Sequence, residues 1–291
     1  MKITEKDLTK LSTIRTKSYA KYFCITESIN DIEDAIEFSS KNDLKLIVMG
    51  KGSNILFSKN RYDKTLFVKL DGGFDFFEVY DKFIEIGAAF SLKLAGKKLV
   101  EMGYEDYIFF NLIPASIGGA ITQNAGIGDN NEIKDVCISV KLFDILDNRI
   151  VELKNKDCLF SYRNSIIKKE PGRFIVLSAK FNNRNKVSNI NRIISLSRQK
   201  TQEKVNREPI GFSFGSTFKN DKKLLAWECI NHIKGKLDSS KDIFYSNKHS
   251  NWIINNTSRT SGKDIVDLIR KTQRLVKEEF DIELENEVRI I

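Results

Sequence analysis

The chain has 291 residues, of which 41% are apolar and 30% charged, with 48 Lys and Arg against 39 Asp and Glu. This apolar content excludes a wholly disordered chain, and 16 Gly with 3 Pro exclude collagen-like or low-complexity sequence. The length suggests about two domains of roughly 150 residues each. No run approaches the ~18 apolar residues of a membrane span, and the start lacks an apolar signal segment, so we expect a soluble, cytoplasmic protein without membrane insertion.

The cysteines and histidines limit the kinds of site the chain can build. Only two histidines occur, His232 and His249, which excludes a His-rich metal centre, and we predict no metal. Four widely spaced cysteines are typical of reduced thiols in the cytosol. They are Cys24, Cys137, Cys158 and Cys229.

The net charge of +9 raises the question of a nucleic-acid partner. The densest basic stretch, Arg184 to Arg207, also carries apolar residues at roughly helical spacing, so one face of a helix should pack and the other face water. No aromatic or zinc-finger pattern of a nucleic-acid module accompanies it. We therefore favour a solvated basic helix, and a positive field would equally attract phosphorylated small molecules.

In chain order, apolar periodicity predicts alternating strands and helices up to residue 181. The strands are expected at 20–25, 44–49, 55–57, 66–70, 83–86, 139–145, 150–153 and 174–181, and the helices at 29–36 and 92–99. The stretch Asn182 to Asn191 has linker-like composition and is taken as the main domain boundary. Beyond it we expect the basic helix, a turn at 211–216, a strand at 251–255, a helix at 262–280 and a final strand at 282–290.

The first glycine-rich segment, Gly50-Lys51-Gly52-Ser53-Asn54, follows a predicted strand, where ligands of α/β units tend to bind. Its glycines would let backbone N–H groups approach a phosphate, and Ser53 and Asn54 add side-chain donors. It is neither a dinucleotide fingerprint nor a P-loop. On its own, an ordinary tight turn remains the simpler interpretation.

The second segment runs from Asn111 to Gly128 and is rich in small residues. Its glycines would expose backbone to a flat ligand or a pyrophosphate, and Gln123 and Asn124 could bond ring edges. A long loop is the plain alternative, but long ordered loops are usually functional. Both segments together fit one extended dinucleotide better than either alone.

Six motifs in order carry a family resemblance: Gly-x-Gly-Ser-Asn at 50–54, Ile-Pro-x-Ser-Ile-Gly-Gly-Ala with Gln-Asn-Ala-Gly at 113–126, Ser-Tyr-Arg-Asn-Ser at 161–165, Gly-Ser-Thr-Phe-Lys-Asn at 215–220, Lys-His-Ser-Asn-Trp-Ile at 248–253 and Glu-Asn-Glu-Val-Arg at 285–289. In them the chain resembles the UDP-N-acetylenolpyruvoylglucosamine reductase (MurB) family over nearly its whole length. The short interval between Arg163 and Ser216 resembles the shorter form of the family, without its inserted loop. The chain departs from the family pattern at Ala115, Asp221 and Trp252, and in the segment from Leu224 to Tyr245.

The resemblance implies an α+β fold. A two-lobed FAD-binding region of the vanillyl-alcohol-oxidase (PCMH) type would span residues 1–182, with lobes of about 1–68 and 69–182. A smaller α/β substrate-binding domain would span 183–281. The last segment, 282–291, would return to the first lobe.

The implied activity is the NADPH-dependent, FAD-mediated reduction of a UDP-N-acetylglucosamine enolpyruvyl ether to UDP-N-acetylmuramate, in peptidoglycan precursor synthesis. We expect the protein to be a monomer. FAD should be non-covalent, because no His precedes residue 232 for histidyl attachment. The expected cofactor-binding residues are Gly50, Lys51, Gly52, Ser53, Asn54, Pro114, Ser116, Gly118, Gly119, Gln123, Asn124 and Gly126.

The resemblance also implies a catalytic trio. Arg163 would stabilise negative charge on the substrate carboxylate, since guanidinium is permanently charged. Ser216 would donate a proton to C2, and Glu287, as the essential glutamate, should be protonated or share a proton with the substrate. Weaker candidates for substrate binding are Tyr162, Lys219, Asn220 and Arg289.

Two other functions stay open at this point. A different flavin oxidoreductase of the same fold could act on an alcohol or hydroxy acid, although Ser216 and Glu287 in register argue against it. A basic nucleic-acid-binding protein would be colourless and bind with steep salt dependence.

Overall fold

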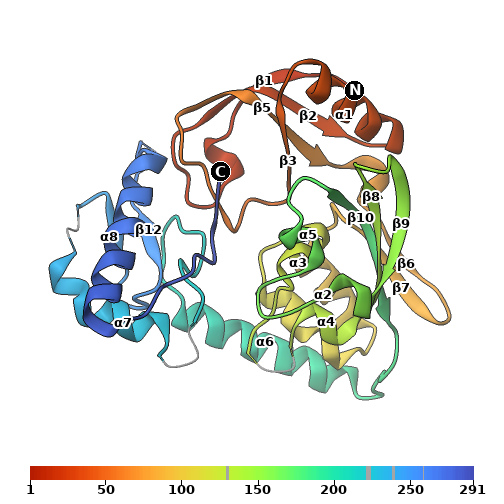
Figure 1. Cartoon of the computed structure of the whole chain (residues 1–291). Coiled ribbons are helices and arrows are strands. Elements are labelled where there is room, and N and C mark those ends of the chain that lie inside the picture. Colours follow the sequence, from red (N-terminus) through yellow and green to blue (C-terminus); the bar gives the residue numbers. More distant parts are fainter. Residues whose placement is uncertain (129–130, 221–223, 238–239, 258) are drawn as a thin grey trace. The chain divides into compact units, whose positions relative to one another are not determined.

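The computed structural model describes residues 1–128, 131–220, 224–237, 240–257 and 259–291 (Figure 1). By its internal packing the chain divides into two compact units. The first comprises Met1–Thr4, Tyr22–Lys51 and Lys64–Lys204, and the second Glu5–Lys21, Gly52–Asp63 and Val205–Ile291. The predicted domains are defined by FAD and substrate binding, which the packing units do not test. Their boundary between residues 182 and 183, the two lobes and the return of 282–291 therefore stay predictions.

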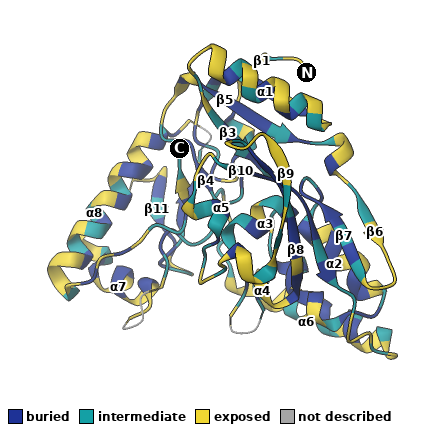
Figure 2. Ribbon diagram, turned by 45° about the vertical axis from the view of Figure 1, so that its right-hand side comes forward, coloured by how far each residue is buried: buried dark blue, intermediate teal, exposed yellow. Residues whose placement is uncertain are grey.

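A five-stranded antiparallel sheet forms the frame of the first unit. Its strand order is β6 (Phe77–Val79), β7 (Phe83–Gly87), β10 (Phe174–Asn182), β8 (Cys137–Asp144) and β9 (Arg149–Lys154). The central strand β10 pairs with both β7 and β8. Its residues from Ile175 to Ala179 are all buried, and Figure 2 shows β8 and β10 as buried strands. Four of these five residues are apolar, as expected of a strand covered on both faces, and the fifth, Ser178, donates to Glu85 Oε1 at 2.6 Å.

Helices gather beside this sheet (Figure 1). They are α2 (Leu92–Glu101), α3 (Ile117–Gln123), α4 (Ile133–Val136), α5 (Ile166–Lys169) and α6 (Ile190–Arg207). The short helix α3 packs against β7 and β10, with Ile117, Ala120 and Ile121 fully buried. The basic helix α6 buries Ile193, whereas Val205, one of the apolar residues whose spacing predicts the packed face, is 59% exposed.

A second sheet has the strand order β1 (Thr4–Asp7), β2 (Tyr19–Thr26), β5 (Arg61–Leu70) and β3 (Lys45–Met49). Strands β3 and β5 are parallel and pair from Lys45 with Thr65 to Met49 with Lys69. The helix α1 (Ile29–Lys41) begins at a capping box in which Ser28 and Asp31 satisfy each other's backbone N–H groups. It thereby brings Ala35 onto a small core with Leu66 and Val68.

The second unit has its own apolar core around two helices, α7 (Ala226–Ile233) and α8 (Gly262–Phe280). The hairpin strands β11 (Ile243–Tyr245) and β12 (Ile253–Asn255) are antiparallel, and β4 (Ile55–Leu56) pairs in parallel with β13 (Arg289–Ile290). The outer face of α8 is exposed (Figure 2). Short 3₁₀ turns complete the described chain: η1 (Thr9–Leu11), η2 (Gly72–Phe74), η3 (Glu105–Leu112), η4 (Asn155–Cys158) and η5 (Lys234–Lys236).

Most predicted elements are confirmed, and the predicted helix at 262–280 has the observed bounds. Two expectations are wrong. The segment 282–290 forms a strand only at Arg289–Ile290, because its partner β4 offers just two residues for pairing. The stretch from Asn111 to Gly128 is not one long loop, since it contains α3.

Candidate active site

The two glycine-rich segments meet in the first unit at Gly50 and Ser116. A Cβ atom on Gly50 would lie 2.4 Å from Ser116 Oγ, so a larger residue there would require the Ser116 hydroxyl to move. Ser116 caps α3, and its hydroxyl accepts a hydrogen bond from the Gly119 N–H at 3.3 Å. The structure therefore brings together two segments that the sequence treats as one candidate site.

Gly52 and Gly119 differ in what surrounds them. Gly52 has φ +71°, and a Cβ there would lie 1.8 Å from the Leu11 carbonyl oxygen, within the second unit. Gly119 is exposed, and a Cβ there would meet only Ser116 Oγ, at 3.4 Å. The structure thus gives Gly52 a conformational reason to be glycine that involves no ligand, whereas the space beside Gly119 is open.

Gln123, at the end of α3, has an amide whose orientation is fixed. Its Oε1 accepts a hydrogen bond from Lys168 Nζ at 2.9 Å, so its NH₂ group points the other way. That Nε2 is buried and has no partner among the described residues. A buried donor without an acceptor costs about 1–3 kcal/mol. The residues present therefore fit a bound group that carries acceptor oxygens, as FAD does.

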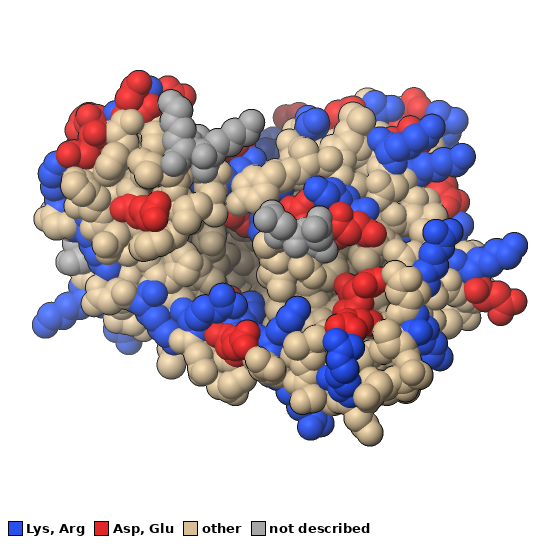
Figure 3. All heavy atoms as spheres, turned by 90° about the horizontal axis from the view of Figure 1, so that it is seen from below, with Lys and Arg blue, Asp and Glu red and all other residues tan. Residues whose placement is uncertain are grey.

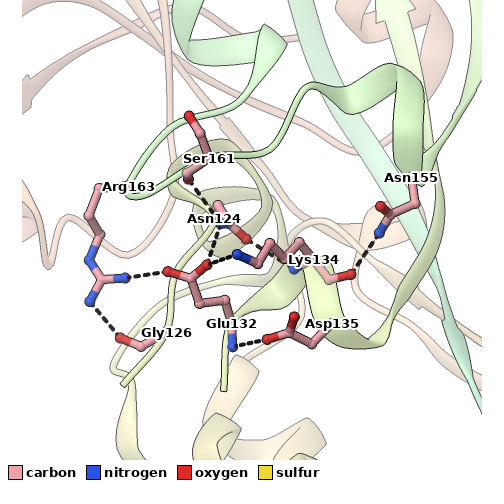
Figure 4. Close-up of polar contacts among 8 residues, drawn as sticks. All are labelled: Asn124, Gly126, Glu132, Lys134, Asp135, Asn155, Ser161 and Arg163. Atoms are coloured by element: carbon pink, nitrogen blue, oxygen red, sulfur yellow. Dashed lines mark hydrogen bonds and ion pairs between the residues drawn. The ribbon is translucent and has the colours of Figure 1, made fainter. Parts of the chain in front are cut away.

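Asn124 follows in the left-handed conformation, with φ 44°, and is fully buried. Its Nδ2 donates to Glu132 Oε2 and to the Ser161 carbonyl, each at 3.0 Å, and its Oδ1 accepts from the Lys134 N–H at 3.0 Å (Figure 4). All three contacts are with protein groups. Asn124 therefore ties the end of α3 to the turn that carries Arg163.

Arg163 lies in a tight turn of the first unit, between Ser161 and Asn164, whose backbone groups bond each other. Its φ of +52° is unusual for a side chain other than Gly or Asn. Such conformations cluster at functional sites. Its Nη2 donates to the Gly126 carbonyl at 2.7 Å, and its Nη1 lies 3.5 Å from Glu132 Oε1. The guanidinium is mostly buried, and its position is fixed at two points.

Ser216 and Glu287 lie in the second unit, on segments joined by backbone hydrogen bonds. The Glu287 N–H donates to the Thr217 carbonyl at 2.9 Å, and Phe218 forms a bridge with Asn286. On the other side, Ser216 forms a bridge with Trp252. Asn54 Nδ2 donates to the Glu287 carbonyl at 3.1 Å. Thr217 therefore connects the two segments: it follows the predicted proton donor Ser216 in the chain, and its carbonyl accepts from the N–H of the predicted glutamate.

The predicted substrate-binding residues occupy different surroundings. Lys219 has a mostly buried side chain and pairs with Glu285, and the Lys219 N–H donates to the Glu285 carbonyl at 2.9 Å. Asn220 Oδ1 accepts from the Ala226 N–H at 3.2 Å. Tyr162 and Arg289 are exposed, and the Tyr162 ring lies 5.0 Å from the Arg163 guanidinium carbon.

The remaining cofactor candidates lie on the two segments: Lys51, Pro114 and Gly119 are exposed, Ser53 and Gly118 are half-buried, and Gly126 is buried. Of the family departures, Asp221 lies outside the described residues, as does the part of the Leu224–Tyr245 segment at 238–239. Trp252 belongs to the backbone ladder of Ser216.

The structure adds residues that the sequence interpretation does not name. Glu132 contacts Arg163, Lys168 bonds both Gln123 Oε1 and the Arg163 carbonyl, and Thr217 separates the two ladders with a buried hydroxyl that has no partner among the described residues. Position in the motifs could have indicated Thr217. Glu132 and Lys168 carry no such signal, because any surface helix or loop has similar charges.

The other titratable groups give no second site. No cluster of His, Cys, Asp and Glu suited to a metal occurs within the described part of the chain, and none of its helices is long and apolar enough to cross a membrane. The four cysteines are buried and none of them forms a disulfide, and burial raises the pKa of Cys24 and of Cys158 to about 12. On the face drawn in Figure 3, basic side chains are interspersed with acidic ones.

Comparison with known proteins agrees with this geometry. Residues 20–154 match the family model of an FAD binding domain, and residues 205–291 match that of the UDP-N-acetylenolpyruvoylglucosamine reductase C-terminal domain. The UDP-N-acetylenolpyruvoylglucosamine reductase of Clostridium kluyveri is 33% identical over 265 residues, which cover 90% of this chain and 84% of that protein. That of Clostridioides difficile is 30% identical over 89% of this chain and 83% of its own length.

The fold agrees as well. The crystal structure of UDP-N-acetylenolpyruvylglucosamine reductase (MurB) from Thermus caldophilus matches 100% of this chain and 99% of its own with a TM-score of 0.80, at 23% identity. The predicted α+β fold class is thereby confirmed. With both family models in sequence order and relatives that align over most of both lengths, the chain belongs to the UDP-N-acetylenolpyruvoylglucosamine reductase (MurB) family.

Proposed function

We propose that this protein catalyses the NADPH-dependent, FAD-mediated reduction of UDP-N-acetylglucosamine enolpyruvyl ether to UDP-N-acetylmuramate, a step in peptidoglycan precursor synthesis. Its relatives carry the name of this enzyme. The observation that carries the proposal is that the Glu287 N–H bonds the carbonyl of Thr217, the residue after Ser216, so that two separate motifs are joined.

FAD would be held non-covalently in the first unit by the segment around Gly50 and by the stretch from Pro114 to Gly126. The unpartnered Gln123 Nε2 and the open space beside Gly119 support this placement. When bound, FAD takes up reducing equivalents from NADPH and supplies the hydride for the enolpyruvyl group. The roles of Lys51, Gly52, Ser53, Asn54 and the other segment residues in binding the cofactor stay predictions.

The chain's own residues then handle charge and protons. Arg163 binds the substrate carboxylate and stabilises the negative charge that develops across C2 and that carboxylate, which is the role of a preorganised cation. Ser216 Oγ donates a proton to C2. During this transfer the Glu287 carboxyl group carries a proton or shares one with the substrate. Tyr162, Lys219, Asn220 and Arg289 would contact the phosphates, sugar or carboxylate of the substrate.

The function is tested with purified protein by following the flavin absorbance anaerobically. We expect a yellow protein whose flavin is released by heat, is bleached by NADPH and is then reoxidised by the enolpyruvyl ether. A colourless protein would contradict the proposal. So would a reduced flavin that is reoxidised by the oxidised form of a hydroxy acid but not by the enolpyruvyl ether.

The glycine pair tests where the cofactor binds. Gly119→Val should leave the protein folded and lower its FAD content, because the side chain would enter space that is open in the structure. Gly52→Ala should instead lower the free energy of unfolding by more than about 1 kcal/mol, because of its positive φ and the Leu11 carbonyl. Flavin content per folded protein, together with the thermal midpoint, separates the two effects. Full flavin in Gly119→Val would move the cofactor elsewhere.

We further propose that the enzyme is a cytoplasmic monomer. Four buried cysteines, none of them in a disulfide, support a reducing compartment. Sedimentation equilibrium of the flavin-loaded protein tests the monomer, for which a mass near 33.4 kDa is expected.

A further inference from the structure

Glu132 is a buried acid beside Arg163. It is 8% exposed and lies on the strand-like segment that forms an antiparallel bridge with Gly126. Its backbone N–H donates to Asp135 Oδ2 at 2.9 Å, which fixes the start of α4. Burying a carboxylate costs free energy unless cations or hydrogen-bond donors surround it. The partners of Glu132 therefore indicate its role.

Each oxygen of Glu132 has its own partners (Figure 4). Oε1 lies 3.5 Å from Arg163 Nη1. Oε2 accepts from Asn124 Nδ2 at 3.0 Å and lies 2.9 Å from Lys134 Nζ. The carboxylate therefore cannot turn towards Arg163 or away from it without losing contacts on its other side.

The same guanidinium is also bonded by the Gly126 carbonyl, at 2.7 Å from Nη2. One acceptor would leave a guanidinium free to rotate about that bond. Two acceptors on different nitrogens, one from each of the bridged residues Gly126 and Glu132, fix its plane. A cation must be fixed in this way before the reaction if it is to stabilise developing charge without reorganising.

We propose that Glu132 is a positioning residue for Arg163: with the Gly126 carbonyl, it fixes the guanidinium in the orientation that receives the substrate carboxylate. This inference rests on the proposed function. Glu132 does not itself contact the substrate in this role, because its two oxygens are taken by Arg163, Asn124 and Lys134.

The charges of the cluster make the role measurable. One carboxylate between Arg163 and Lys134 leaves a formal charge of +1, so the cluster still attracts an anionic substrate. Replacing Glu132 by neutral Gln raises that charge while it loosens the guanidinium. Attraction for the substrate and stabilisation of the transition state should then change in opposite directions.

The first experiment compares both half-reactions of the flavin-loaded enzyme in Glu132→Gln. We expect kcat to fall about ten- to a hundredfold, as when an outer partner of a functional group is removed. The KM for the enolpyruvyl ether should stay unchanged or fall, and bleaching by NADPH should keep its wild-type rate. If kcat is unchanged, or if KM rises in parallel with the loss of kcat, the positioning role is wrong.

Asp144 and Arg173 provide a matched control in the same unit. Asp144 is 2% exposed, and its Oδ2 lies 3.0 Å from Arg173 Nη2, so this pair likewise joins a buried carboxylate to an arginine. Asp144→Asn should lower the thermal midpoint and leave kcat and KM unchanged. If it produces the same split as Glu132→Gln, the split reports general destabilisation and the inference fails.

Lys134→Gln is the opposite change of charge. It removes the exposed cation from Oε2 and keeps the contact between Glu132 and Arg163, so KM should rise about two- to fivefold with little change in kcat. If Glu132→Gln does not fold, Glu132→Asp replaces it, because its shorter carboxylate keeps the charge and loses the contact. Its kcat should fall while KM stays at the wild-type value, and a wild-type kcat would overturn the inference.

Binding of the product provides a readout other than turnover. Calorimetric titration of UDP-N-acetylmuramate should give Glu132→Gln an affinity equal to or above that of the wild type, and weaker binding would contradict the charge argument. Failure of the proposed function is distinguishable, because it would show in the wild type, as a flavin that the enolpyruvyl ether does not reoxidise. Failure of the inference would show only in the variants.

Discussion

Arg163 and the pair Ser216–Glu287 are positioned in opposite ways. The Arg163 guanidinium is fixed by side-chain and carbonyl contacts from a turn whose own backbone lies in an unfavoured region, at φ +52°. Ser216 and Glu287 are positioned by backbone bonds, in which Thr217 contributes its N–H to Asn251 and its carbonyl to Glu287. The first arrangement depends on charge and the second on chain geometry.

This difference predicts how each region responds to substitution. A ladder made of backbone groups tolerates the loss of a side chain, because the hydrogen bonds remain. A guanidinium fixed by a buried carboxylate depends on every member of its cluster, since losing one leaves a buried charge poorly compensated. Variants of Ser216 should therefore be clean chemical probes, and variants around Arg163 should not.

The largest effect is expected for Ser216→Ala. The ladder should stay intact, so FAD content, stability and bleaching by NADPH should match the wild type. Reoxidation by the enolpyruvyl ether should slow by about 10²- to 10⁴-fold, the contribution of a general acid. Anaerobic stopped-flow at the flavin band measures both steps, and Ser216→Cys should recover part of the rate. Slower bleaching in Ser216→Ala would contradict both the proton-donor role of Ser216 and the expectation that the backbone ladder stays intact.

Arg163 allows the side chain and the strained backbone to be separated. Arg163→Ala and Arg163→Gly should both lose about 3 kcal/mol of transition-state stabilisation, roughly a hundredfold in rate. Because only Gly accepts φ +52° without strain, Arg163→Gly should be more stable than Arg163→Ala by about 1 kcal/mol. Urea unfolding compares the two. Equal stabilities would mean that the turn relaxes, and near-normal rates would remove Arg163 from the mechanism.

Two side chains also bond backbone groups of this region: Asn251 bonds both backbone groups of Phe218, and Asn54 bonds the Glu287 carbonyl. Asn54→Ala probes how much the position of Glu287 depends on the second contact. We expect the free energy of unfolding to fall by about 1 kcal/mol, as for one hydrogen bond, and reoxidation to slow by less than tenfold. Flavin content measured alongside tests the predicted cofactor role of Asn54, which requires it to fall as well. Unchanged flavin would show that the Asn54 side chain serves the Glu287 carbonyl and not the cofactor.

The smallest effect concerns His249, whose Nδ1 accepts from the Asn251 N–H beside the ladder, at 3.3 Å. Burial lowers the pKa of His249 below its ordinary value near 6.5, so the unfolded chain binds the proton more readily. The resulting stability is complete above pH ~6.5 and is lost as the pH falls through the folded-state pKa. Urea midpoints between pH 7 and 5 should decline less in His249→Gln. Identical slopes would remove His249 from the pH dependence.

The sequence predicts those parts of the fold whose periodicity is strong. Helix α8 has its apolar residues at helical spacing and a Ser261 cap, and its predicted bounds are those observed. Helix α3 is missed because Gly118 and Gly119 have low helix propensity. It forms because Ser116 caps it and because Ile117, Ala120 and Ile121 pack on the sheet, which is tertiary information.

The candidate site divides in the same way. Motifs name Arg163, Ser216 and Glu287, but no pattern indicates that the Glu287 N–H bonds the Thr217 carbonyl, since that depends on the course of the chain between them. Glu132 is missed for a different reason: its importance comes from a contact with Arg163, and an acid in a polar loop is usually solvated.

The pairing of β4 with β13 has a consequence for synthesis. The Asn54 amide and the Glu287 carbonyl that it binds are 233 positions apart, so one partner of this contact is among the first residues made and the other among the last. Closing such a long interval is slow, because its chain entropy is lost before the contact forms. Glu287, which the reaction needs, therefore reaches its position only after nearly the whole chain has left the ribosome. A prematurely terminated chain could fold much of its first unit and still have no Glu287 to place.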